Sequence, residues 1–218
     1  MVYRRYNNIR FNNDSRYNIC RWIYDICDKI YNVDEKKQNK VMSRYIFHYT
    51  ITLLDYILIN YENPLNNIIA LHLAVACFYK VIASLVKNKS SVNVFILEHM
   101  LPSDYDKHLF TKLLFYVHNK LENIKFIYIV DYFPCEYGNI YINANNNDQK
   151  CLKLALELVD IYICSRATST YPSKLISDAA KCVAYDLIHN HKHLYQQNDD
   201  FSECYKQMLI LAQNIFHN

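Results

Sequence analysis

The sequence predicts an all-α protein made of two consecutive groups of helices. Apolar residues recur at helical spacing along most of the chain, which is typical of amphipathic helices. Only one glycine and four prolines occur in 218 residues, too few for the many turns of an all-β fold. Segments 64–86 and 172–189 are rich in apolar and small residues, so we expect each at the centre of one group.

The first group is expected to contain helices over 16–31, 34–59, 64–86, 91–100 and 103–121. Its opening helix places Ile19, Trp22, Ile23, Ile26 and Ile30 on one stripe. The expected N-terminal caps are Asp14 or Ser15, then Asp34, then Ser103 or Asp104, while Pro64 is expected to start the third helix.

The second group begins after a junction near 121–125. Segment 124–133 is apolar and β-branched, which fits either a strand or a short buried helix. A loop is expected over 134–149, followed by helices over 150–164, 172–189 and 201–216. Pro172 suits a first helical turn. Ala179, Ala180 and Ala184 leave room for a neighbouring helix to approach closely.

Charge and composition exclude several classes of function. The net charge of +3 is too small to indicate a nucleic-acid-binding protein by itself, although five arginines lie within the first 21 residues. We interpret residues 1–14 as a solvated N-terminal arm. The single glycine, Gly138, rules out a glycine-rich phosphate loop. No nucleophile–base pair or paired-carboxylate motif stands out, so we expect no enzyme activity and no cofactor.

The eight cysteines form no C-x-x-C motif and show no zinc-ligand spacing. Because no signal peptide is recognisable, we expect reduced, mostly buried thiols in a cytoplasmic or nuclear protein, with Cys20 and Cys27 in the core. The tract 189–193 alternates histidine with polar residues and is expected to be a loop, not a metal site. No apolar run is expected to reach the length of a membrane span, because the longest candidate, 68–86, is interrupted by His72 and Lys80.

Three segments in order resemble the cyclin family over about residues 15–216. Segment 16–26 is similar to the opening helix of the cyclin box, with Arg16, Ile19, Trp22 and Asp25 at matching positions. Tyr171-Pro172-Ser173 followed by Ala179-Ala180 resembles the Y-x-PS…AA helix of the second cyclin fold. The acidic and apolar segment 155–158 is similar to the family helix that precedes it. Segment 201–205 resembles the start of the penultimate family helix.

The resemblance implies two tandem cyclin-like folds of about five helices each, over 15–122 and 123–218, the second divergent and without a recognised final helix. It implies a regulatory subunit that binds and activates, or retargets, a cyclin-dependent protein kinase and has no active site of its own. In the family a Lys of the third helix and a Glu of the fifth contact the kinase. The best match for the Lys is Lys80, and Leu114 occupies the Glu position. Segment 82–85 offers an alternative register for that Lys, and a surface role for Lys80 is an equal alternative.

Other positions depart from the family. Arg21 stands where the family has the acidic partner of the Arg, so the resemblance gives Arg16 no partner there. Phe47-His48 replaces a family Asp-Arg pair. A substrate-docking patch would use Ile19, Trp22 and Asp25. Because Ser15 and Asn18 replace apolar residues, we expect only weak docking of Arg-x-Leu ligands.

Two other functions fit the same helical pattern. A transcription-factor-IIB-like adaptor would bind nucleic acid and polymerase through a basic second repeat. A kinase-binding decoy would keep the fold without activating the kinase, as the Glu-to-Leu replacement at Leu114 suggests. The mild, dispersed charge favours a protein partner over nucleic acid. The abundance of Tyr and Asn is typical of an AT-rich viral or protozoan genome.

Overall fold

Helices form almost all of the regular structure in the computed structural model, which describes residues 13–32, 38–85, 100, 105–122, 124–133, 147–166, 170–191 and 199–216. They are α1 (Asn13–Asn32), α2 (Gln38–Asn60), α3 (Asn67–Leu85), α5 (Lys107–Leu121), α7 (Asn147–Ser165), α8 (Ser173–His189), α9 (Asp200–Phe216) and the short 3-10 helix η1 (Ile129–Tyr132). No strand occurs among these residues. The predicted all-α class is confirmed.

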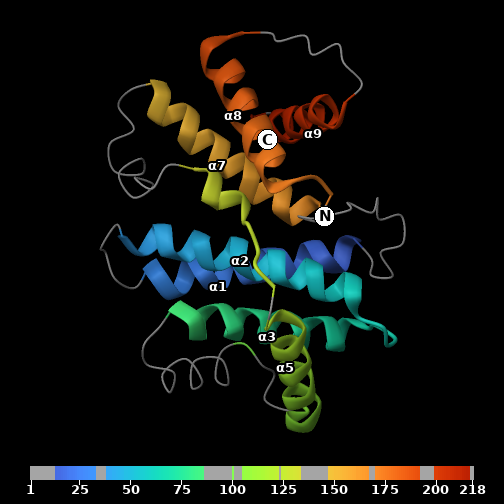
Figure 1. Cartoon of the computed structure of the whole chain (residues 1–218). Coiled ribbons are helices and arrows are strands. Elements are labelled where there is room, and N and C mark those ends of the chain that lie inside the picture. Colours follow the sequence, from blue (N-terminus) through green and yellow to red (C-terminus); the bar gives the residue numbers. More distant parts are fainter. Residues whose placement is uncertain are drawn as a thin grey trace.

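The helices stack in layers, as Figure 1 shows. α1 and α2 pack side by side, α3 packs against α2, and α5 packs against α3. On the opposite side of the α1–α2 layer lie α7, α8 and α9. α2 contacts α1, α3, α5, α7 and η1, so it links the first helices of the chain to the last.

The two segments expected at the centres of the groups behave differently. α3 is fully buried at Ala70 and from Leu73 to Phe78, as an apolar central helix should be. α8 buries only one face, through residues that include Ala179, Ala180 and Val183, and it exposes Lys174 and Tyr185. The expectation of an apolar α8 centre is therefore correct for one face only.

Helix starts differ from the predicted ones because side-chain caps decide them. α3 begins at Asn67, not at Pro64, since the Asn66 amide oxygen accepts a hydrogen bond from the backbone N–H of Ile69 at 2.8 Å. α5 begins after Asp106, whose carboxylate accepts from the N–H groups of His108 and Leu109 at 2.9 and 3.0 Å. Asp106 therefore replaces the predicted caps Ser103 and Asp104, which lie outside the described residues.

The start of α8 is shifted by one residue. Pro172 adopts an extended conformation as the cap, and Ser173 is the first helical residue. The end of α8 lies inside the histidine tract, because His189 is helical and Asn190 terminates the helix with a φ of 53°. Asn tolerates this left-handed conformation better than most residues.

The connection between the two halves is an extended segment, 124–128, followed by η1. It contains no strand, and its helical part is the short 3-10 helix η1, which buries Ile129 and Val130, so the alternative of a short buried helix is correct for 129–132 only. Tyr128 stacks on Tyr49 of α2 with ring centroids 3.6 Å apart, and Phe126 meets Tyr56 edge-on at 5.3 Å. Ser173 of α8 donates its hydroxyl to the Ile127 carbonyl at 2.9 Å. The connection is thus attached to both halves.

Among the residues that the structure describes, one helix is long and apolar enough to cross a membrane, by length and composition only. It is the stretch Asn67–Ser84 of α3, so the expectation that no run reaches this length is wrong. His72 and Lys80 do not interrupt the helix. Because 56% of the stretch is buried inside the bundle, its apolar character matches that of a core helix.

Several predicted features lie outside the described residues. These are most of the N-terminal arm, the cap Asp34, the helix over 91–99, the loop over 134–146 and residues 192–193 of the histidine tract. The last residues of the predicted loop, from Asn147, belong to α7.

α8 packs against α7, α9 and η1, and its small residues Ala179 and Ala180 are fully buried. Replacing the fully buried Ala180 by Leu should lower the free energy of unfolding by about 1–3 kcal/mol, because a larger side chain would force the helices apart. Urea denaturation followed by circular dichroism would measure this. Lys174→Ala on the exposed face of α8 is the control and should change stability by less than about 0.5 kcal/mol. Equal effects of the two substitutions would contradict the close packing.

Candidate protein-binding groove and the junction that positions it

Arg16 of α1 is buried at the junction between the two halves, with 3% of its surface exposed. Its Nε donates to Asp55 Oδ1 at 2.8 Å and its Nη2 donates to Asp55 Oδ2 at 2.9 Å, a bidentate pair with α2. Its Nη1 donates to the carbonyl oxygen of Cys164 at the end of α7, at 3.1 Å. One guanidinium therefore connects three helices.

Burial alone would lower the pKa of the Arg16 guanidinium, because desolvation disfavours the charged form. The charge of Asp55 and its hydrogen bonds more than offset that effect, and the pKa is raised above its ordinary value. Arg16 is thus charged inside the protein, and this buried charge is tolerated because the Asp55 carboxylate lies opposite it.

A second buried ionic contact lies along the same junction. Asp160 of α7 faces Arg44 Nε at 3.0 Å and His48 Nε2 at 2.7 Å, and both of these residues belong to α2. His48 is fully buried, and its Nδ1 has no hydrogen-bond partner among the described residues. The geometry fits a neutral ring that donates from Nε2 to Asp160, because a protonated Nδ1–H would be a buried donor without an acceptor.

These contacts resolve what the sequence left open about Arg16. Its partner is Asp55, 39 residues along the chain, and not a residue of its own helix. Arg21 instead faces solvent and pairs loosely with Asp25 at 3.6 Å. Asp55 carried a signal in the sequence, since it is the one carboxylate of α2 and lies in the apolar stretch 53–59. His48 of α2 contacts Asp160 of α7.

A groove opens on the far side of the first half, between the C-terminal part of α3 and the exposed face of α5. It has a volume of about 230 Å³ and is lined by Tyr79, Lys80, Thr111, Leu114, Phe115, Val117 and His118. A cavity of roughly 150 Å³ is enough to hold a benzene ring. The groove can therefore receive at least one large apolar side chain.

The helical repeat of α5 explains which side chains line the groove. Thr111, Leu114, Phe115 and His118 are spaced i, i+3, i+4 and i+7, so they lie on one face of the helix. Asp106 caps the start of α5, and Phe110, Leu113, Val117 and Leu121 are buried. Phe115 is left 66% exposed at the groove.

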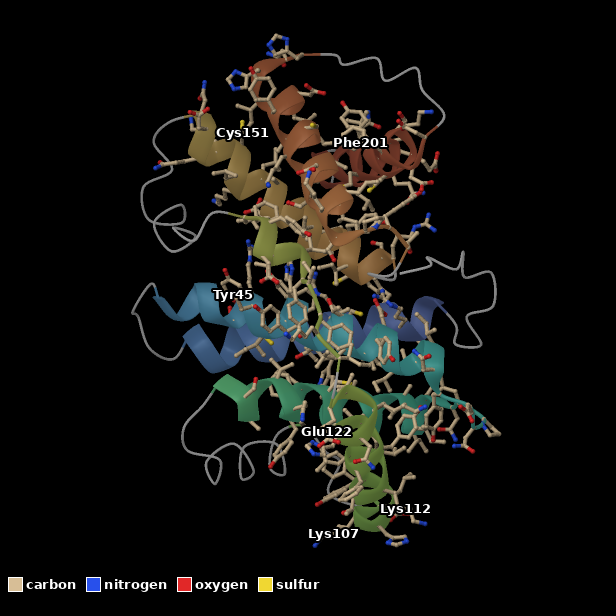
Figure 2. The ribbon with its side chains drawn as sticks, in the orientation of Figure 1. Tyr45, Lys107, Lys112, Glu122, Cys151 and Phe201 are labelled. Atoms are coloured by element: carbon tan, nitrogen blue, oxygen red, sulfur yellow. The ribbon has the colours of Figure 1, made fainter. Side chains whose placement is uncertain are left out.

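Lys80 and His118 lie across the groove from each other. Lys80 Nζ lies 2.9 Å from His118 Nδ1, which links α3 to α5 at one end of the groove. Lysine has no acceptor, so the ring nitrogen must accept this hydrogen bond and carry no proton. Figure 2 shows Lys107 and Lys112 toward the other end of α5, with Glu122 following its C-terminus.

The structure brings together the two residues that the sequence singled out for kinase contact. Lys80 and Leu114 both line this groove. The proposed docking residues Ile19, Trp22 and Asp25 lie on α1 and do not line it. Ile19 and Trp22 are half-buried against the core, and Asp25 is exposed. Arg16, Ala179 and Ala180 are buried, as their structural roles require.

Tyr79, Thr111, Phe115 and His118 also line the groove and are not among the contact residues predicted from the sequence. The spacing of the last three with Leu114, on one helix face, is the signal in the sequence that points to them. No group of three or more His, Cys, Asp or Glu side chains that could hold a metal ion occurs within the described ranges.

Comparison with known protein families, curated proteins and solved structures finds no match for this chain.

Neutralising Asp55 should destabilise the protein strongly. Asp55→Asn leaves the buried Arg16 charge without its carboxylate, which should lower the free energy of unfolding by about 3–5 kcal/mol. Chemical denaturation at neutral pH would measure the loss. As a control, Asp25→Asn breaks the exposed Arg21–Asp25 pair of α1 and should cost less than about 1 kcal/mol. A small effect at Asp55 would show that the pair does not support the junction.

The double variant Arg16→Met, Asp55→Leu separates the charge from the packing. Because it removes both ions and keeps apolar volume, it should recover much of the stability that Asp55→Asn loses, measured by the same denaturation. If it were as unstable as Asp55→Asn, the contact between Arg16 and the Cys164 carbonyl would be the more important part of the junction.

Proposed function

We propose that this chain is a cyclin-like regulatory subunit that binds a cyclin-dependent-type protein kinase and changes its activity. The observation that carries the proposal is that Lys80 and Leu114, chosen from sequence by resemblance to cyclins, lie together in one apolar groove between α3 and α5. A helical protein with such a groove, fixed on a rigid junction, is suited to hold a helix of another protein.

The mechanism follows from binding energy. A kinase with a mobile helix populates active and inactive arrangements, and a partner that binds only one of them shifts the population toward it. In this chain α3 and α5 would supply the contact surface. The Arg16–Asp55 pair would keep α1 and α2 fixed behind α3, so that binding energy moves the kinase and not the regulator.

The contacts that the groove offers to a kinase bear on whether the chain activates that kinase or only binds it. Leu114 and Phe115 line the groove where the family has an acidic contact, so partner binding would depend on apolar packing with Lys80 at one end. Apolar packing is enough for affinity. Whether the captured kinase becomes active is the property that separates a regulator from a decoy.

The charge pattern of the second half does not favour the nucleic-acid adaptor. Its described residues from 147 to 216 include six Lys or Arg and eight Asp or Glu. Affinity for duplex DNA or RNA depends on neutralising phosphates with an excess of cations. We also propose a cytoplasmic or nuclear location, with which the free cysteines of the described residues agree.

The test is to purify the tagged full-length chain from eukaryotic cell extracts and to identify bound protein kinases by mass spectrometry. A radiolabelled phosphate assay on the eluate would then measure kinase activity. We expect one cyclin-dependent-type kinase, more active with the chain than without it. Recovery of the kinase without added activity would indicate a decoy, and recovery of no kinase from several cell types would refute the proposal.

A substitution at Lys80 tests whether the groove is the contact. Lys80→Ala should reduce kinase retention roughly tenfold, because a charged hydrogen bond to the partner is lost. Lys150→Ala removes an exposed lysine of α7 and is the matched control. Quantitative immunoblotting of the kinase on both variants gives the ratio. Equal retention would place the kinase contact elsewhere.

A further inference from the structure

The two helices that form the groove carry charge of one sign. Between them α3 and α5 contain four lysines, Lys80, Lys107, Lys112 and Lys120, and no aspartate or glutamate. The nearest carboxylates in sequence lie at the ends of α5. Asp106 is occupied by the backbone N–H groups that it caps, and Glu122 follows the C-terminus.

Three of the four lysines are placed to act on an occupant of the groove. Lys80 lines it directly. Lys107 precedes Thr111 by four residues and so shares its helix face, and Lys112 borders the same face. Lys120 lies on the other side of α5, where its Nζ is 5.7 Å from the ring centroid of Tyr116. The groove thus has an apolar floor and a cationic border, with Glu122 as the exception at one end.

We propose that the occupant of this groove is an amphipathic helix with bulky apolar side chains on one face and acidic side chains on its flanks. This inference rests on the proposed function for the location of the contact and adds the chemistry of the partner segment. A helix suits the site because the groove runs between two helices and its floor repeats at i, i+3, i+4 and i+7. Phe115 and Leu114 would pack against the apolar face, and Lys107 and Lys112 would face the carboxylates.

Lys80 would change partner when the helix binds. In the free protein its Nζ donates to the neutral His118 ring at 2.9 Å. A carboxylate on the incoming helix is a stronger acceptor than imidazole, because both partners are then charged. Lys80 would turn toward it and release His118. An acidic side chain near Lys80 would therefore add to selectivity for acidic segments.

Two designed peptides test this chemistry on the full-length chain. One is a capped peptide of about 16 residues, long enough for helix formation, with Leu and Phe at i, i+4, i+7 and i+11 in an Ala/Glu background. The other is its twin with every Glu replaced by Lys. Fluorescence anisotropy of the labelled peptides should show at least roughly tenfold tighter binding of the Glu peptide, with the difference decreasing as salt is added.

Substitutions on the protein locate the binding. Phe115→Ala and Lys112→Glu should each weaken binding of the Glu peptide several-fold, and Lys112→Glu should also improve binding of the Lys twin. The matched controls are Ile210→Ala, which truncates a 57% exposed residue of α9, and Lys150→Glu on α7. Both controls should bind like the unmodified chain. Circular dichroism checks that all four variants fold, which the exposure of these side chains favours.

The outcomes separate this inference from the proposed function. Equal binding of the two peptides, no binding of either, or unchanged binding by Phe115→Ala, would overturn the inference even if a kinase co-purifies with the chain. Selective binding of the Glu peptide that both substitutions weaken would support the inference even if no kinase is recovered. In that case the kinase proposal fails and the acidic-helix site stands.

Discussion

The buried contact of Arg16 with Asp55 and with the Cys164 carbonyl is the interaction on which the rest of the structure depends. A buried guanidinium is tolerated only when its charge and its N–H groups are satisfied, and here the partners come from α2 and α7. The position of α1 is therefore fixed relative to both halves at once. Asp160, with Arg44 and His48, repeats the arrangement along the same surface of α2.

The effect of this junction extends to the groove through α2. One side of α2 bears the ionic contacts with α1 and α7, and α3 also packs against α2. α3 in turn supports α5, so the groove lies at the end of a continuous series of packed helices. A groove held by packed helices would reduce the entropic cost of binding a partner there.

Helical periodicity was enough to predict the class of the fold and the approximate place of every described α-helix, because 3.6-residue patterns are local. Helix starts were less predictable: Asn66 and Asp106 are caps that compete with several nearby candidates. The partner of Arg16 was missed because the pair joins residues 39 positions apart, and only tertiary packing decides it. Lys80 and Leu114 were found from sequence, but Phe115 and His118 required the relative placement of α3 and α5.

The hydrogen bond from Arg16 to Cys164 has a mechanical consequence. The acceptor lies in the last turn of α7, where unpaired carbonyls concentrate the negative end of the helix dipole. A cation at that point resists sliding of α1 along α7, because any displacement would separate opposite charges in a poorly solvated space. A displacement of α7 would therefore be passed to α1 and, through Asp55, to α2.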